Sequence, residues 1–225
     1  MESKDQPLPI LFQDEWIVAV NKPAGQLVHP AGKPVEGDLV TMKILRDQIG
    51  QQVYVIHRLD RPTSGVLLFA TDLEAARNLH AAFENREVAK VYWAVVDGIP
   101  ADEQWLCQEP IRKEEGKIER AAATSFRLLQ HLPGQLALVE AKPKTGRFHQ
   151  IRRHLLHAGT PIVGDYRYAA IDRCDELGER LGTGSRMLLQ ARSLQFRHPV
   201  SGKDQLIEAP LDPLIQQLVP DDSGR

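Results

Sequence analysis

The stretch HRLDRPTSGVLLFA, residues 57–70, places a charged turn directly before a strongly apolar segment. The preceding VYVI (53–56) and the final VLLFA (66–70) are rich in β-branched and large apolar residues, as buried strands are. The link between them contains the turn formers Pro62, Ser64 and Gly65. Asp60 therefore lies between two arginines at the mouth of a predicted hairpin. Because a buried carboxylate needs a partner, this aspartate is either a paired structural ion or a reagent.

The composition limits which classes of protein are compatible with the chain. It has 225 residues, of which 42% are hydrophobic, and a net charge of -2, so a site for a polyanion has to be a local patch. Cys107 and Cys174 are isolated, which is typical of a reducing compartment. The start MESKDQPLPI lacks the apolar core of a signal peptide, and no apolar run approaches ~18 residues. We expect a cytoplasmic protein without a membrane segment.

The hydrophobic pattern predicts more strands than helices. Three helices are expected. One covers 71–87 with Asp72 as its N-cap, one covers 145–159 and ends at Gly159, and a short closing helix covers 213–219. Residues 101–121 are charged and are expected to form an irregular, exposed excursion. Strands are expected over 10–13, 16–20, 88–98, 123–131, 134–143 and 186–196, most of them joined as hairpins. The fold class is therefore α+β, with a mixed, mainly antiparallel sheet and flanking helices.

A local cationic patch occurs in KPKTGRFHQIRRHLLHAG, residues 142–159. Between Glu140 and Asp165 there is no acidic residue, and three histidines add further donors. One interpretation is a solvated basic helix face. The spacing argues that some of these cations point inward, where a buried arginine would need a carboxylate. The cations of the patch are Lys142, Lys144, Arg147, Arg152 and Arg153.

Two alternative chemistries find little support in the motifs. HRLD resembles part of a kinase catalytic loop, but a glycine-rich loop, V-A-I-K and D-F-G are all missing. The histidines His154 and His157 lack the spacing and the glutamate of H-E-x-x-H, so no metal site is predicted. Tyr92, in AKVYWAVV, is either an ordinary strand aromatic or, beside Lys90 and Arg86, part of a surface for an unstacked base.

Taken together, five elements resemble the RluA-type pseudouridine synthases in sequence and in order, over roughly residues 10–210. They are DEWIVAVNKPAG, HRLDRPTSGVLLFA, AKVYWAVVDG, KPKTGRFHQIRRHLLHAGTPIVGD and RMLLQARSLQFRHPVSG. The resemblance implies an α+β fold with a central catalytic cleft, and isomerisation of a uridine in RNA to pseudouridine without cofactor or metal. It also implies a tail over 1–9, a catalytic domain over 10–213 and a C-terminal segment over 214–225, without the S4-type RNA-binding module of many relatives.

The same resemblance assigns roles to individual residues. The catalytic aspartate corresponds to Asp60, the base-contacting tyrosine to Tyr92, and the arginine that pairs with the aspartate to Arg152. Arg58, two residues before the aspartate, takes part in displacing the target base in that family. Lys22, in NKPAG, is either an RNA contact or a turn-flanking lysine. The remaining predicted RNA contacts are Arg147, Lys144 and Arg153.

The RNA substrate is less determined than the chemistry. Several motifs are most similar to the member of the family that modifies uridine 65 of transfer RNA, whereas GDYRYAAIDRC (164–174) departs from that member's pattern. Ribosomal RNA is therefore the main rival to transfer RNA, and no obligate protein partner is expected. The alternatives to a synthase are a non-catalytic RNA-binding module and a hydrolase that uses Asp60. A hydrolase of the usual plan would need a second carboxylate.

Overall fold

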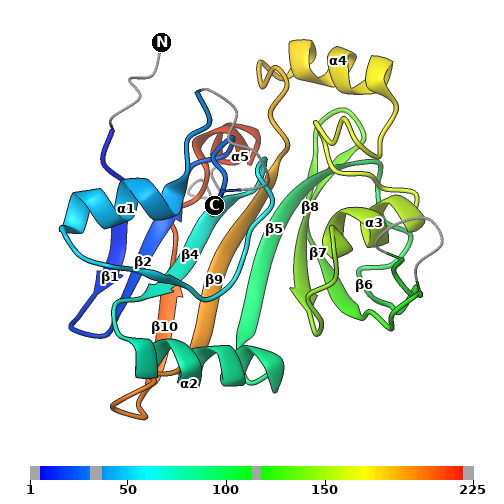
Figure 1. The fold of residues 1–225 in the computed structure, drawn as a ribbon. Coiled ribbons are helices and arrows are strands. Elements are labelled where there is room, and N and C mark those ends of the chain that lie inside the picture. Colours follow the sequence, from blue (N-terminus) through cyan, green and yellow to red (C-terminus); the bar gives the residue numbers. More distant parts are fainter. Residues whose placement is uncertain (1–5, 31–36, 113–117, 220–225) are drawn as a thin grey trace, which may run out of the picture. The chain divides into compact units, whose positions relative to one another are not determined.

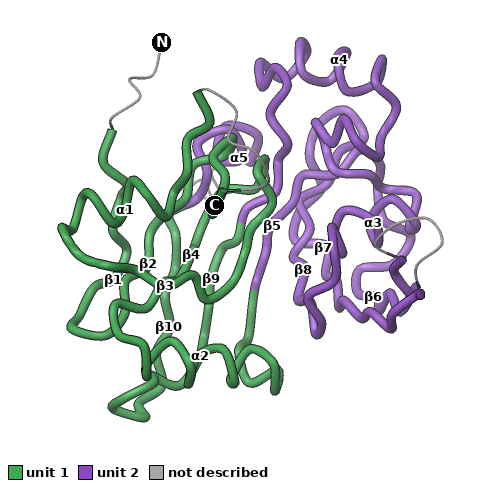
Figure 2. Tube along the Cα trace, viewed as in Figure 1, with its two compact units in different colours: residues 1–90, 191–210 green, residues 91–190, 211–225 purple. Residues whose placement is uncertain are grey.

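The predicted hairpin around the HRLD segment forms in the computed structural model, which describes residues 6–30, 37–112 and 118–219. Strand β3 (Tyr54–Val55) pairs antiparallel with β4 (Ser64–Ala70). Within the described ranges the chain forms two units (Figure 2). Each unit has its own hydrophobic core. Unit 1 contains residues up to 90 and 191–210, and unit 2 contains residues 91–190 and those from 211 onward.

The strands of unit 1 are arranged around β4, all seven residues of which are buried. Their order is β1-β2-β4-β9, and β10 pairs with β9 (Figure 1). The pairings of β1 with β2, β2 with β4 and β9 with β10 are antiparallel. A continuous apolar run such as VLLFA suits a strand that is covered on both faces. The other strands are β1 (Ile10–Gln13), β2 (Ile17–Lys22), β9 (Leu189–Arg197) and β10 (Asp204–Glu208).

The turn that precedes β4 is shorter than the sequence predicted. Ser64 and Gly65 belong to the strand, and the turn itself lies at residues 61–62. Gly65 has φ 108, and a Cβ atom at this position would overlap the backbone carbonyl of Ala191 in β9. Gly65 is therefore needed for the close approach of β4 and β9 and not for the turn.

The helix expected over 71–87 is confirmed as α2 (Leu73–Glu84), and the Asp72 side chain accepts a hydrogen bond from the Ala75 N–H as its cap. Leu73, the first residue of the helix, is 47% exposed. A further helix, α1 (Thr41–Ile49), was not predicted. Its N-cap, Val40, supplies no side-chain hydrogen bond, so the local sequence carries no start signal.

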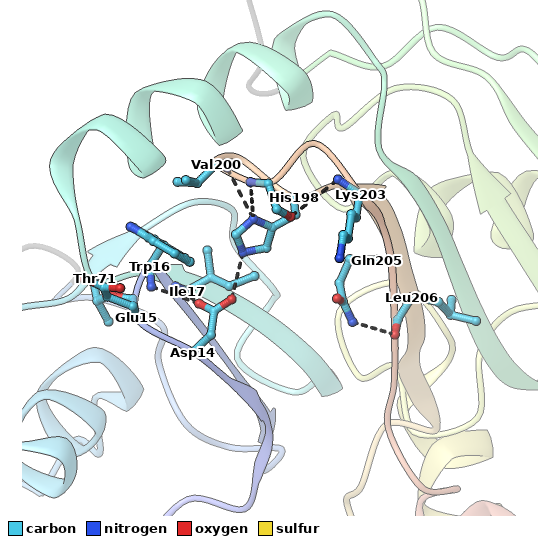
Figure 3. A network of polar contacts seen from close by, with 11 residues as sticks. Asp14, Glu15, Trp16, Ile17, Thr71, His198, Val200, Lys203, Gln205 and Leu206 are labelled. Atoms are coloured by element: carbon cyan, nitrogen blue, oxygen red, sulfur yellow. Dashed lines mark hydrogen bonds and ion pairs between the residues drawn. The ribbon is translucent and has the colours of Figure 1, made fainter.

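A histidine and an aspartate tie two turns of unit 1 together (Figure 3). The His198 Nδ1 atom accepts hydrogen bonds from the backbone N–H groups of Val200 and Ser201, so Nε2 carries the proton and donates to Asp14 Oδ2 at 2.8 Å. Asp14 Oδ1 accepts from the N–H groups of Trp16 and Ile17. This contact joins the β1–β2 turn to the β9–β10 turn.

The strands of unit 2 pair in the order β5-β8-β7-β6, and all three of these pairings are antiparallel. The strands predicted over 123–131 and 134–143 are confirmed as β7 and β8, which pair as a hairpin. The excursion predicted over 101–121 is wrong in part, because it contains the four-residue strand β6; residues 113–117 lie outside the described ranges. The strands are β5 (Ala89–Asp97), β6 (Gln104–Cys107), β7 (Thr124–Leu132) and β8 (Leu136–Pro143).

Three helices lie among the described residues of unit 2. Helix α3 (Gln150–His157) contacts β7 and β8 and begins five residues later than predicted, because residues 145–149 form a loop that ends in a turn at 148–149. Helix α5 (Pro213–Leu218) confirms the expected closing helix, and α4 (Ile171–Arg180) was not predicted. The mainly antiparallel α+β fold expected from the sequence is confirmed. Among the described residues, no helix is long and apolar enough to cross a membrane.

Candidate active site

Asp60 lies half-buried in the loop that connects β3 to β4. Its carbonyl accepts a hydrogen bond from the Thr63 N–H at 3.0 Å, which closes the turn after it. Leu59, the residue before it, is buried, and so is Thr63. The loop is therefore anchored on both sides of the aspartate, and the carboxylate is carried by a segment with little freedom to move.

His57 fixes the start of the same loop. Its Nε2 atom accepts a hydrogen bond from the Leu68 N–H at 3.1 Å, and its ring stacks on Phe83 with centroids 5.0 Å apart. Burial and, to a smaller extent, the charge of Lys90 lower the pKa of His57 to about 3. The imidazole is thus neutral at physiological pH and acts as a hydrogen-bond acceptor for strand β4.

Lys22 is fully buried, with 0% exposure, at the end of β2. Its Nζ atom donates to the backbone carbonyls of Pro23 and Gln26 at 2.8 and 2.9 Å, and to that of Arg61 at 3.2 Å. The Gly25 N–H donates to the same Arg61 carbonyl. The NKPAG turn is therefore joined to the HRLDR loop through Lys22. This geometry supports the interpretation of Lys22 as a turn-flanking lysine over its interpretation as an RNA contact.

The two arginines beside Asp60 have different surroundings. Arg58 is exposed. The Arg61 side chain donates from Nε to the Gly25 carbonyl at 2.9 Å and lies 3.1 Å from an Asp38 carboxylate oxygen. Arg61 thus holds the two loops together from the outside, while Arg58 is presented to solvent.

In unit 2, Arg152 projects from α3 and is 5% exposed. Its Nε donates to Asp165 Oδ2 at 2.8 Å and its Nη2 to Asp165 Oδ1 at 2.6 Å. Asp165 is 1% exposed. Sequence reasoning expected a buried arginine in the 142–159 patch but did not assign Asp165 to it. The available signal was that Asp165 is the first acidic residue after the patch.

The segment before Asp165 requires a glycine. Gly164 has φ 76, and a Cβ atom there would overlap the carbonyl of Arg186. The backbone of residues 164–165 can therefore lie directly against the segment before β9. This contact sets the position of Asp165 and, through it, the plane of the Arg152 guanidinium.

Tyr92 lies half-buried on β5, opposite Ala141 of β8. Its ring packs against a core cluster of unit 2 that includes Ile151 and Leu155 of α3. Tyr92 and Arg152 thus belong to the same unit, and both are held by rigid elements. Asp60 belongs to unit 1, so the predicted pairing of Asp60 with Arg152, like the predicted cleft, stays a prediction.

The other cations of the patch differ in exposure. Lys144 is exposed, and Arg147 is half-buried with its Nε donating to the Ala121 carbonyl at 3.1 Å. The backbone N–H of Arg147 donates to the side chain of Gln150, which also bonds Thr145. Arg153 is half-buried and donates to the Arg112 carbonyl at 2.6 Å. Arg147 and Arg153 are therefore oriented by backbone carbonyls.

His154 of α3, one of the two histidines considered for metal binding, is hydrogen-bonded within the protein. Both ring nitrogens of the buried His154 have partners, Thr124 Oγ1 at 2.9 Å and the Glu109 carbonyl at 3.0 Å. Burial lowers the pKa of His154 from its usual value. In the part of the chain that the structure describes, no three His, Cys, Asp or Glu side chains gather as a group that could hold a metal ion.

The sequence and the fold match one family of enzymes. Residues 16–157 match the family described as RNA pseudouridylate synthase, so the chain belongs to that family and is an RNA pseudouridine synthase. The matched region contains Lys22, Asp60, Tyr92 and Arg152. The resemblance inferred from the five motifs is confirmed, and so is the enzyme class. A non-catalytic module and a hydrolase are thereby set aside.

Relatives of known name are similar over nearly the whole chain. A tRNA pseudouridine synthase C of Salmonella typhi is 39% identical and covers 94% of this chain and 88% of its own length. The tRNA pseudouridine synthase C of Vibrio cholerae is 40% identical, with 94% of each chain covered. Human RNA pseudouridylate synthase domain containing 4 is a solved structure with a TM-score of 0.76 and 27% identity, covering 93% of this chain and 90% of its own.

Proposed function

We propose that this enzyme converts a uridine of transfer RNA to pseudouridine. The observation that carries the proposal is the similarity to proteins named tRNA pseudouridine synthase C, which extends over 94% of this chain. The motif resemblance adds uridine 65 as the position to test first. The predicted cytoplasmic location is part of the same proposal, because transfer RNA is available there.

In this proposal Asp60 is the nucleophile. The reaction breaks the N-glycosidic bond between uracil N1 and the sugar C1′, turns the base, forms a bond between C5 and C1′, and releases the proton of C5. A carboxylate can hold one fragment covalently while the other reorients. The anchored loop around Asp60 supports this role, because a nucleophile has to be held at the ångström level. The same bonds are broken and formed overall whether Asp60 attacks the sugar or the uracil ring.

Arg152 and Tyr92 complete the proposed machinery. A guanidinium carries five N–H donors, and the bonds with Asp165 use two of them. Asp165 therefore fixes the plane of Arg152 for its proposed pairing with Asp60. Tyr92, partly buried on a rigid strand, would lie against the extruded uracil. Arg58, exposed two residues before Asp60, would occupy the place that the base leaves.

Of the proposed RNA contacts, Arg147, Lys144 and Arg153 remain. Each carries a cation on the 142–159 patch at partial or full exposure. Lys22 is revised to a positioning residue, because its ammonium group is buried among backbone carbonyls. Phosphate contacts from a local patch would also explain how a chain with a net charge of -2 binds RNA.

The test follows tritium released from C5 of uridine. Transfer RNA and ribosomal RNA transcripts labelled with 5-tritiated uridine are incubated separately with the full chain. We expect release from transfer RNA only, and loss of that release when uridine 65 is replaced by cytidine. Release from ribosomal RNA alone would show that the substrate proposed here is wrong.

A further inference from the structure

Four side chains beside the Arg152–Asp165 pair form a layered cluster in unit 2, which we call the aromatic platform. The Phe148 and His149 rings are stacked with an interplanar angle of 21°. The Arg167 guanidinium lies over the Phe148 ring at 5.5 Å and over the Tyr168 ring at 6.0 Å from the centroid. Tyr168 meets His149 edge-on, with an interplanar angle of 84°.

Polar contacts hold the platform in place. The His149 Nδ1 atom and the Tyr168 hydroxyl are 2.9 Å apart, which is a hydrogen bond. The Arg167 N–H donates to Asp165 Oδ1, and the Tyr168 N–H donates to the Asp165 carbonyl. His149 adopts φ 53, a left-handed conformation that costs a β-carbon residue free energy and persists only when its surroundings fix it. The platform is therefore organised by the same aspartate that orients Arg152.

The platform is not part of the hydrophobic core. Phe148, His149 and Tyr168 are only partly buried, and Arg167 is exposed. None of the four belongs to the two core clusters described for unit 2. A phenylalanine that only needs burial would be covered by apolar side chains. The Phe148 ring instead contacts the His149 ring and a guanidinium, and an arginine on an aromatic face is the combination that binds nucleobases by stacking.

The position of the aromatic platform, next to Arg152, relates the platform to the reaction. The Arg152 guanidinium lies over the Tyr168 ring at 5.0 Å, so the same tyrosine contacts Arg152 and Arg167. Arg147, one of the proposed phosphate contacts, directly precedes Phe148. A nucleotide stacked on the platform would thus be a near neighbour of one at Arg152. Extrusion of a base leaves its neighbours without a stacking partner, and an aromatic surface can replace it.

We propose that the aromatic platform binds, by stacking, an unpaired base of the substrate RNA close to the target uridine. The proposal rests on the proposed function for the placement of Arg152 at the reacting uridine. Stacking tolerates any base, so the platform selects for a nucleotide that is available to stack and not for its sequence. Phe148 and Arg167 are the residues that make the contact.

The test is a double-mutant cycle between protein and RNA. The affinities of wild type, Phe148→Leu and Phe148→Trp are measured for intact substrate RNA. They are also measured for RNAs with one abasic nucleotide, placed in turn at each position near the target uridine. We expect one abasic position to weaken wild-type binding by about 5- to 100-fold. Phe148→Leu should weaken binding of intact RNA similarly and be nearly insensitive to that abasic position. Phe148→Trp should retain the wild-type response.

Two controls keep the outcomes separate. Arg197→Gln removes an exposed cation of unit 1, where the side chain is 83% exposed, and should leave the cycle unchanged. Equal abasic penalties in wild type and Phe148→Leu at every position would overturn the platform. If wild type modifies ribosomal RNA and not transfer RNA, the proposed substrate fails, and the same cycle on ribosomal RNA still decides whether the platform binds a base.

Discussion

Arg152 and Asp165 form a two-pronged ion pair inside unit 2, in which both side chains are almost completely buried. Such a pair is costly to break, because the remaining charge has no water to solvate it. The pair also has a defined plane, which a lysine cannot reproduce. Gly164 sets the position of Asp165, and Asp165 in turn orients Arg152, the arginine proposed to act on Asp60.

Replacement of Arg152 by lysine should therefore separate catalysis from RNA binding. We expect Arg152→Lys to lower the single-turnover rate by orders of magnitude and to change RNA affinity much less, because the positive charge is kept. Arg153→Lys, next to it and half-exposed, is the control and should be nearly silent. Equal, small effects in both variants would mean that Arg152 does not brace a catalytic group.

The partner of Arg152 offers a second test. Asp165→Asn keeps the shape of the side chain but leaves a buried guanidinium without its carboxylate. We expect the free energy of unfolding, measured in urea, to fall by about 3–5 kcal/mol. Asp175→Asn, on the exposed face of α4, is a suitable control with little expected effect. A loss below about 1 kcal/mol in Asp165→Asn would show that the pair contributes little to stability.

Asp60→Asn tests the nucleophile directly. The amide keeps the size and much of the hydrogen bonding of the carboxylate but cannot form the covalent intermediate. We expect pseudouridine formation to be lost and RNA affinity to stay within a few-fold of wild type, measured by tritium release and filter binding. Pseudouridine formation at a rate comparable to wild type would remove Asp60 from the catalytic role.

The salt dependence of RNA binding distinguishes basic residues that contact phosphate from basic residues that hold the fold together. Arg147→Ala should reduce the slope of log K against log salt by roughly one unit if Arg147 contacts one phosphate. Lys22→Met should leave that slope unchanged and lower the free energy of unfolding instead, because three backbone carbonyls lose the ammonium group that donates to them. A reduced slope in Lys22→Met would restore Lys22 as an RNA contact.

The low pKa of His57 predicts acid sensitivity. Its pKa is about 3 in the folded protein and about 6.5 when unfolded, so the unfolded chain binds the extra proton between these values. The stability it contributes is therefore present above pH 6.5 and lost as the pH falls toward 3. We expect a loss of about 1–2 kcal/mol between pH 7 and pH 5 in urea titrations. His57→Gln should show a smaller loss over the same range, and an identical loss would exclude His57 as its source.

Local signals in the sequence predicted much of the fold. Helix α2 could be predicted because Asp72 caps it and its apolar residues recur at helical spacing. Helix α4 could not, because Ala170 supplies no side-chain cap and Gly178 stands in its interior, where it lies against the carbonyl of Gly184. The short strand β6 was missed because its pairing with β7, and not its own composition, makes it a strand.

The sequence by itself determined the family, the chemistry and the candidate residues Asp60, Tyr92 and Arg152, because these depend on short motifs whose residue types and spacing are local. Only the tertiary structure decided that Asp165 is the partner of Arg152 within unit 2 and that Lys22 is buried among carbonyls. The physical reason is that a side chain's partner and its access to water are set by segments distant in sequence, which meet only when the chain is packed. A pattern along the chain contains the residue type, and the fold determines what that residue can touch.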